Sequence, residues 1–145
     1  KNEWFNLWTL NYASLGEEAP EKCPVCGSPK TVFSAKENIL KTAEDEADNV
    51  EKHSPVININ KECGLIPEGC TDVHVKIGEQ LHPMEKEHFI IFIDCYLNQE
   101  FISRVHLTPE NLNPVACLHL KAEQGKFTTI AFCNIHGHWI AEKEL

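Results

Sequence analysis

The chain has 145 residues, of which 42% are hydrophobic and 24% are charged, enough apolar material for one domain with or without a small appendage. The formal net charge of -9 would repel a nucleic-acid backbone, so we expect no nucleic-acid partner. No apolar run approaches the roughly 18 residues of a membrane span, and the polar first ten residues do not resemble a secretory signal. We therefore expect a cytoplasmic protein that does not bind membranes.

Cysteine and histidine are abundant, with seven and eight residues respectively. An odd number of cysteines, in a chain large enough to fold without crosslinks, indicates thiols used for metal or redox chemistry in a reducing compartment. A disulfide framework is disfavoured for the same reason. Metal binding is therefore the first functional hypothesis.

Residues 1–36 contain many turn-forming residues and one CxxC pair, Cys23 and Cys26. From Ser34 to Val50 the composition changes to Ala, Lys, Glu and Asp. Ser34 followed by Glu37 is typical of a capping box, so this stretch predicts a short helix or a solvated charged linker. We place the first domain at residues 1–36 and the linker at residues 37–50.

Residues 51–145 have the pattern of a β domain. The segments "PVININ", "DVHVKIG", "HFIIFIDCYL", "EFISRVHL", "VACLHLKA" and "KFTTIAFC" are separated by turn signals such as "PEG", "TPENLNP" and "EQGK". Six or more short strands in about 95 residues are typical of an all-β sandwich. The expected fold class is therefore mainly β.

Five side chains stand out as candidate metal ligands because they lie at predicted strand ends or in loops: His53, His82, His88, Cys133 and His136. Side chains from separate parts of a sandwich can converge at such positions. The other histidines are weaker candidates. His74, His106 and His119 alternate with apolar neighbours and are expected to be solvated on strands, and His138 is expected to be a neighbour that shapes the pocket, although a ligand role stays open.

Three segments that contain these residues, "EKHSPVI", "LHPMEKEHFI" and "CNIHGHW", resemble the motifs of the superoxide reductase family, also called desulfoferrodoxins and neelaredoxins. The resemblance implies an immunoglobulin-like β-sandwich over residues 51–145 that holds one mononuclear non-haem iron. It also implies the ligands: four equatorial imidazoles and one axial thiolate, from His53, His82, His88, His136 and Cys133.

The same resemblance assigns roles to two charged residues. Glu51 matches the carboxylate that can occupy the sixth iron position in the oxidised form, and Lys52 matches the lysine beside the open ferrous site. The implied activity is one-electron reduction of superoxide to hydrogen peroxide, with Lys52 attracting the anion and helping to deliver a proton. The family also implies an external electron donor such as rubredoxin, and a homodimer or larger homo-oligomer.

The segment "GEEAPEKCPVCGSPKTVF" resembles the second half of the rubredoxin-like knuckle found in rubrerythrins, whose four cysteines bind one metal. The first cysteine pair should fall near positions 7 and 10, where this chain has leucine. Two cysteines do not complete a four-ligand site, so we expect a degenerate, metal-free knuckle. A disulfide between Cys23 and Cys26, or weakly held zinc or iron, stays open. The fold of the knuckle is expected to depend on aromatic residues, namely Trp4, Phe5, Trp8, Tyr12 and Phe33.

The remaining thiols match no ligand spacing that we recognise. Cys63 and Cys70 flank "GLIPEG" and could face each other across a hairpin, where an incidental disulfide is conceivable. Cys95 and Cys117 are expected to be small buried apolar residues.

Two other functions are consistent with parts of the pattern: a non-catalytic metal-binding domain and an electron-transfer β-sandwich. A blue-copper site uses a weak axial methionine after its cysteine, but the single methionine, Met84, lies far upstream of Cys133. A structural zinc site would need neither Glu51 nor Lys52.

Overall fold

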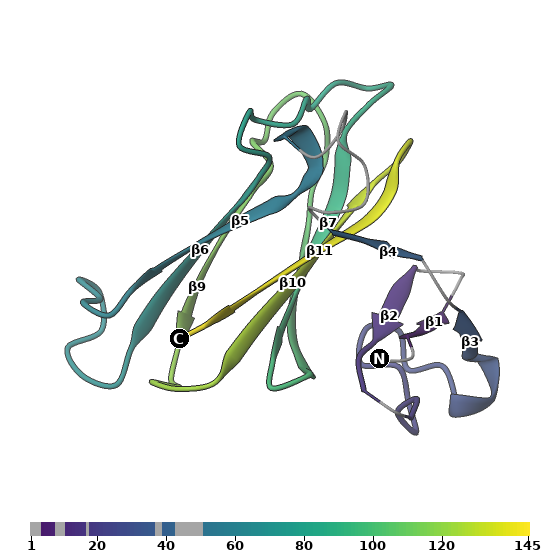
Figure 1. The fold of residues 1–145 in the computed structure, drawn as a ribbon, viewed down its shortest axis with the longest axis horizontal. Coiled ribbons are helices and arrows are strands. Elements are labelled where there is room, and N and C mark those ends of the chain that lie inside the picture. The colour runs from purple at the N-terminus through teal and green to yellow at the C-terminus, as the bar shows by residue number, and fades with distance from the viewer. Residues whose placement is uncertain (1–3, 8–10, 17, 37–38, 43–50) are drawn as a thin grey trace.

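The structure is a computed structural model that describes residues 4–7, 11–16, 18–36, 39–42 and 51–145. Strands account for nearly all of its regular secondary structure (Figure 1). Three short strands and a 3-10 turn lie near the N-terminus: β1 (Trp4–Leu7), β2 (Tyr12–Ser14), η1 (Lys30–Val32) and β3 (Ser34–Lys36). The rest of the chain carries β4 (Leu40–Lys41), β5 (Pro55–Asn60), β6 (Thr71–Ile77), β7 (Ile90–Leu97), β8 (Glu100–His106), β9 (Val115–Leu120), β10 (Lys126–Cys133) and β11 (Gly137–Glu144).

Two sheets pack face to face and form the predicted sandwich. One has the strand order β5-β6-β9 and the other β4-β11-β10-β7-β8. Apolar side chains that alternate along the strands meet between the sheets, including Val73 and Val75 of β6 with Ile93 and Phe127 of the larger sheet. His74 lies between the two valines and is exposed, as the alternation predicts. The mainly-β, immunoglobulin-like sandwich expected from the sequence is confirmed.

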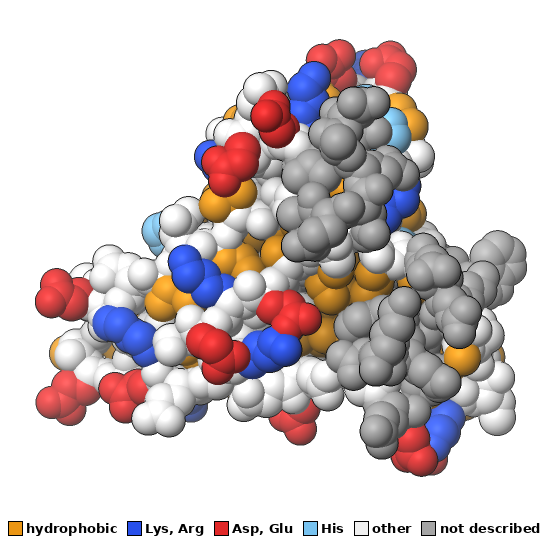
Figure 2. Space-filling view, viewed as in Figure 1, with side chains coloured by type: hydrophobic (Ala, Val, Ile, Leu, Met, Phe, Trp, Pro, Cys, Tyr) orange, Lys and Arg blue, Asp and Glu red, His pale blue; other side chains and the backbone are white. Residues whose placement is uncertain are grey.

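The surface of the sandwich carries charges of both signs. Figure 2 shows acidic and basic side chains interspersed on the visible face, with hydrophobic side chains visible between them. Within the described part of the chain, no helix is long and apolar enough to cross a membrane.

Of the two alternatives for the stretch from Ser34 to Val50, a helix or a charged linker, a helix that begins at Ser34 is contradicted by the structure. Residues Ser34–Lys36 form β3, which pairs with β1 in the small sheet β2-β1-β3. Leu40–Lys41 form β4, which runs parallel to β11 with Leu40 buried. Strand partners elsewhere in the fold therefore override the local capping pattern. Residues 37–38 and 43–50 of the expected linker lie outside the described residues, and residues 51–53 are helical.

The N-terminal segment packs against the outer face of the larger sheet, which the sequence did not predict. A second buried cluster joins residues from both parts of the chain: Tyr12, Ala13, Leu15, Cys23, Leu40, Tyr96, Ile130 and Ile140. The Tyr12 ring stacks on the Tyr96 ring with centroids 6.2 Å apart and meets Phe101 edge-on at 5.3 Å. The aromatic role expected for Tyr12 and Phe33 is confirmed by their edge-on contact at 6.3 Å. The roles expected for Trp4, Phe5 and Trp8 concern side chains outside the described residues.

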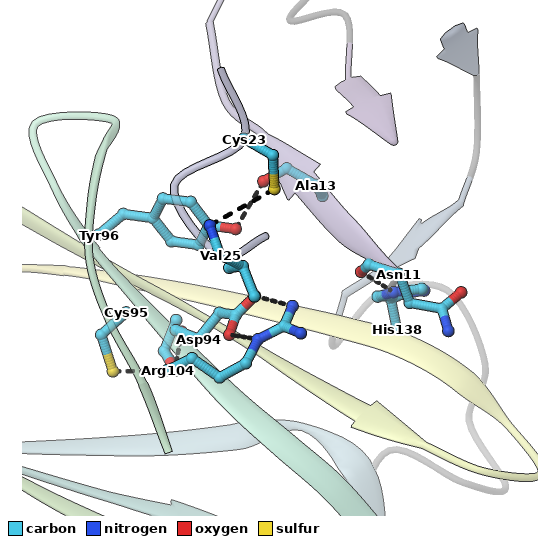
Figure 3. A network of polar contacts seen from close by, with 10 residues as sticks. Asn11, Ala13, Cys23, Val25, Asp94, Cys95, Tyr96, Arg104 and His138 are labelled. Carbon is cyan, nitrogen blue, oxygen red and sulfur yellow. Dashed lines mark hydrogen bonds and ion pairs between the residues drawn. The ribbon is translucent and has the colours of Figure 1, made fainter. Parts of the chain in front are cut away.

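Polar contacts fix this interface at buried positions (Figure 3). The Tyr96 hydroxyl donates to the Ala13 carbonyl at 2.6 Å, and His138 Nε2 lies 2.9 Å from the Asn11 carbonyl oxygen. Next to them, the Arg104 guanidinium donates two hydrogen bonds, of 2.6 and 2.8 Å, to the buried Asp94 carboxylate. Burial raises the pKa of Asp94, and the Arg104 guanidinium opposes that effect. The N-terminal segment and the sandwich therefore share one satisfied polar interface.

Replacing Tyr96 by Phe should lower the free energy of unfolding by about 1–3 kcal/mol, because the buried Ala13 carbonyl would lose its donor. Urea unfolding of the full chain measures the change. Metal content serves as the control, because Tyr96 lies outside the histidine cluster described below. An unchanged free energy of unfolding would show that the hydroxyl does not hold the interface.

Candidate metal centre

The five predicted metal ligands all lie at one end of the sandwich. His53 precedes β5, His82 follows β6 and His88 precedes β7, while Cys133 ends β10 and His136 lies in the turn to β11. Strand register produces this convergence. The start of β5 faces the end of β6 through the pair Pro55↔Ile77, and Cys133 pairs with both Ile90 of β7 and Gly137 of β11.

The four imidazole rings form a square. Neighbouring ring centroids are 4.6 Å apart for the pairs His53–His82, His82–His88 and His53–His136, and 5.1 Å apart for His88–His136. The diagonal pair His53–His88 is wider, at 6.0 Å. Neighbouring rings cross at 66–78°. The rings therefore surround a common centre.

The ring nitrogens are oriented as metal ligands. His82 Nδ1 lies 2.7 Å from the Pro83 carbonyl oxygen, so Nδ1 carries the proton and donates it, and Nε2 keeps its lone pair. That Nε2 lies 3.2 Å from His53 Nε2. His88 Nε2 is buried and has no hydrogen-bond partner among the described residues. A buried polar atom without a partner is costly, and a metal ion at the centre of the square would satisfy it.

Cys133 lies beside this square, fully buried. Its sulfur accepts the backbone N–H of His136 at 3.4 Å and lies 3.8 Å from His136 Nδ1. The potential ligand atoms of His53, His88, Cys133 and His136 are all within 4.8 Å of one another. Burial raises the pKa of Cys133, whereas the backbone N–H groups of His136 and Ile135 lower it. These N–H groups favour the thiolate, which is the form that binds metals.

The imidazoles of His82 and His88 are held in the neutral form that a metal requires. Burial lowers the pKa of His82 to about 4, and the neighbouring His53 adds to the effect. Burial also lowers the pKa of His88, with His136 second and Lys52 a further cause. His53 and His82 are buried, whereas His88 and His136 are half-buried. The cluster is therefore accessible to solvent on the side of His88 and His136.

Glu51 and Lys52 lie at the surface in the helical residues that lead into His53. The effect of Lys52 on the pKa of His88 places its charge within electrostatic reach of the cluster. The Glu51 carboxylate accepts a hydrogen bond from Gln80 Nε2 at 2.9 Å. Gln80 could not be identified from sequence, because no spacing rule connects it to Glu51.

Gly78 allows the segment that carries Lys52 and His53 to lie against the end of β6. Its φ is +92°, and a Cβ there would lie 2.8 Å from the Lys52 carbonyl oxygen and 2.2 Å from that of Gln80. Its N–H donates to the Ser54 carbonyl at 3.1 Å. Any larger residue would push the His53 segment away.

Asn134 connects the Cys133 turn to the His88 segment and was not among the residues predicted from sequence. Its Nδ2 donates to the Glu87 carbonyl at 3.0 Å, and its Oδ1 accepts the Phe89 N–H at 3.0 Å. Its own N–H donates to the Phe89 carbonyl at 3.2 Å. Three hydrogen bonds thus hold Cys133 and His88 in register. The only sequence signal was its position next to Cys133.

Trp139 packs against the histidine cluster, whereas the neighbouring His138 contacts Phe132 and the N-terminal segment. The buried Trp139 ring stacks on His53 with centroids 4.9 Å apart, and its Nε1 donates to the His136 carbonyl at 3.2 Å. His138, on the opposite face of β11, packs on Phe132 at 4.4 Å and contacts the N-terminal segment through Asn11. The structure therefore does not bring His138 into the cluster.

The N-terminal CxxC forms a turn with a local hydrogen-bond pattern. The Val25 N–H donates to Cys23 Sγ at 3.4 Å, and Cys26 Sγ donates to Ser28 Oγ at 3.1 Å. Over the described ranges, no group of three or more ligand side chains includes either cysteine. Leu10 and the side chain of Leu7 lie outside the described residues. A metal-free pair therefore stays a prediction.

Two other predictions about thiols can be compared with the structure. Cys95 is fully buried between the sheets, as expected. Cys117 is exposed, so its predicted burial is wrong. It lies opposite His74 on the outer face of β9, where the alternation of the strand directs it to solvent.

Comparison with known proteins identifies two family matches. The desulfoferrodoxin family model matches residues 45–142. The model for the rubredoxin-like domain of rubrerythrin matches residues 11–34. The rubredoxin-like resemblance of the N-terminal segment is thus confirmed.

Individual relatives agree with these matches. A desulfoferrodoxin from Syntrophotalea carbinolica is 35% identical over 117 residues, covering 81% of this chain and 76% of the relative. A superoxide reductase from Pyrococcus abyssi is 34% identical over 106 residues, covering 66% and 88%. Among solved structures, the superoxide reductase (neelaredoxin) from Ignicoccus hospitalis aligns with a TM-score of 0.62 at 30% identity, covering 74% and 94%. The superoxide reductase from Nanoarchaeum equitans aligns with a TM-score of 0.60 at 30% identity, covering 73% and 99%. The chain belongs to the desulfoferrodoxin family, whose members include superoxide reductases.

Proposed function

We propose that the protein is a superoxide reductase whose single iron ion would be held by the imidazoles of His53, His82, His88 and His136 and the thiolate of Cys133. The observation that carries the proposal is the square of four imidazoles with the unpartnered Nε2 of His88 and the buried Cys133 sulfur beside it. Membership of an oxidoreductase family supports it.

The donor set favours iron over zinc. A structural zinc site closes with four ligands, whereas five protein donors leave one of six octahedral positions for a small ligand. An iron ion held by these five donors would supply one electron to superoxide. With that electron and two protons, superoxide becomes hydrogen peroxide. The N–H groups that point at Cys133 would stabilise its thiolate through both redox states.

Lys52 and Glu51 provide the remaining functions. Lys52 gives an acidic protein a local positive charge next to the half-buried, accessible side of the cluster, so it would attract superoxide and relay a proton through water. Gln80 holds the Glu51 carboxylate at the start of the helical residues that lead into His53. Glu51 would promote release of the peroxide product by competing with it for the metal.

The electron donor is proposed to be a separate protein. A knuckle whose CxxC pair, Cys23 and Cys26, has no further ligand among the described residues would not serve as a second redox centre. A rubredoxin or a similar small carrier in the cytoplasm would then reduce the iron. A homodimer or larger assembly and the domain limits 1–36, 37–50 and 51–145 are proposed by analogy with the family.

The function is tested by mixing anaerobically reduced, iron-loaded protein with superoxide. We expect one hydrogen peroxide for each superoxide consumed, together with a visible thiolate-to-iron absorption band in the oxidised product. Cys133→Ser should lose both the band and the activity, because the band arises from its sulfur. One peroxide for every two superoxide ions would indicate dismutation and contradict the proposal, and so would a purified protein that binds no iron.

Lys52→Ala should slow the reaction with superoxide at low salt by about tenfold and weaken its dependence on ionic strength. Stopped-flow kinetics over a range of salt concentrations measures both effects. Lys121→Ala is the matched control, because it removes the same charge from an exposed position beyond β9. Equal rates for the two variants would show that the charge of the whole protein governs the encounter.

Asn134→Ala should weaken iron retention by about 10- to 100-fold, as loss of a supporting hydrogen-bond partner does at other metal sites. The rate of iron loss to a chelator measures this effect. Asn111→Ala, in an exposed loop, controls for the loss of an amide side chain. If Asn134→Ala holds iron as tightly as the control, the two side-chain hydrogen bonds to the His88 segment do not position the ligands.

A further inference from the structure

A second group of potential metal ligands lies at one end of the β5-β6-β9 sheet, opposite the candidate iron centre. Cys63 and Cys70 come from the β5–β6 connection, Asp72 from the start of β6, and His119 from the end of β9. The iron-centre residues lie beyond the other end of β6, about 20 Å away for a strand of this length. In Figure 1 the β5–β6 connection is the blue-green loop at the lower left.

The four donor atoms lie at distances that suit a tetrahedral ion. Cys63 Sγ and Cys70 Sγ are 3.3 and 3.7 Å from His119 Nδ1, and Cys70 Sγ is 3.6 Å from Asp72 Oδ1. All four lie within 4.8 Å of one another. Tetrahedral zinc with ordinary bond lengths separates its ligand atoms by about 3.3–3.8 Å. The 2.6 Å contact of Asp72 Oδ1 with His119 Nδ1 is shorter, and it would open by less than about 1 Å on binding.

Strand pairing presents this arrangement before any ion binds. Asp72 and His119 are directly opposed across β6 and β9. Cys70 is two residues before Asp72, which puts it on the same face. Cys63 is brought back to this face by the loop, where its sulfur accepts the Ile66 N–H at 3.4 Å. The two cysteines have free thiols.

The ionisable side chains of this group shift one another's pKa values. Hydrogen bonding by Cys70 lowers the pKa of the Cys63 thiol, and loss of solvation together with Cys63 raises that of Cys70 to about 12. Contact with Cys63 also raises the pKa of His119. Cys63, Cys70 and His119 are thus close enough to alter one another's proton binding, and a divalent cation would compete with those protons.

We propose that Cys63, Cys70, Asp72 and His119 form a second metal site that binds one Zn²⁺ ion, separate from the iron centre. Two thiolates and an imidazole select a borderline-soft ion such as zinc over Mg²⁺ or Ca²⁺, which prefer oxygen ligands only. A fourth protein ligand closes the coordination, as in structural zinc sites. The ion fastens the β5–β6 connection to β9. The site could not be identified from sequence, because Cys63 and Cys70 are seven positions apart and His119 joins them only through the register of β6 and β9.

The site is tested with Co²⁺, a coloured substitute for Zn²⁺, added to the iron-loaded full chain under anaerobic, reducing conditions. We expect one equivalent of Co²⁺ to bind with thiolate-to-cobalt absorption bands, and Zn²⁺ to displace it. The double variant Cys63→Ser/Cys70→Ser should lose this equivalent and its bands. His119→Ala should keep the thiolate bands and bind Co²⁺ at least tenfold more weakly.

Two controls locate the ion. Cys117→Ser removes an exposed thiol two residues from His119, and Cys23→Ser/Cys26→Ser removes the N-terminal pair. Both variants should bind Co²⁺ like the original chain. The circular dichroism spectrum of each variant, recorded before Co²⁺ is added, reports whether it is folded. The proposal is overturned if folded Cys63→Ser/Cys70→Ser retains the cobalt equivalent, if Cys23→Ser/Cys26→Ser loses it, or if the original chain binds none.

Discussion

The antiparallel register of the sandwich strands is the constraint on which the candidate iron centre depends. Cys133 pairs with Ile90 on one side and Gly137 on the other. The ligands at or next to the ends of β7, β10 and β11 therefore lie side by side at one end of the sheet. A shift of one residue in any of these pairs would turn a ligand to the opposite face of its sheet. Gly78 and Asn134 then set the finer positions of the turns. The centre is thus a product of strand pairing, refined by a close backbone approach and three hydrogen bonds.

The sandwich and its principal ligands were predictable from sequence because they depend on local patterns. Alternation such as that of Val73 and Val75 identifies strands, and His82 and His88 occur where the pattern breaks. The failures have a common physical cause. Ser34 begins a strand because β1 supplies backbone partners, and Cys117 is exposed because β9 turns that face to solvent. In both cases a distant segment decided the outcome, and no local window contains that segment.

The two ends of the β5-β6-β9 sheet differ in how far their potential metal ligands can be predicted from sequence. At one end the ligands follow recognisable motifs. At the other, Asp72 and His119 are 47 positions apart and meet only because β6 and β9 pair in a particular register. Cysteines that match no ligand spacing therefore need the fold before their chemistry can be assigned.

The docking of the N-terminal segment has a consequence for the sandwich as an independent unit. β4 lies along β11, and the knuckle covers Tyr96, Ile130 and Ile140 on the outer face. A shortened chain that began after residue 42 would expose β11 as an unpaired edge strand, next to the exposed apolar side chains of Tyr96, Ile130 and Ile140. Such a combination invites self-association between copies. The knuckle, with or without a metal of its own, would then act as a permanent cover for a face the sandwich could not leave open to water.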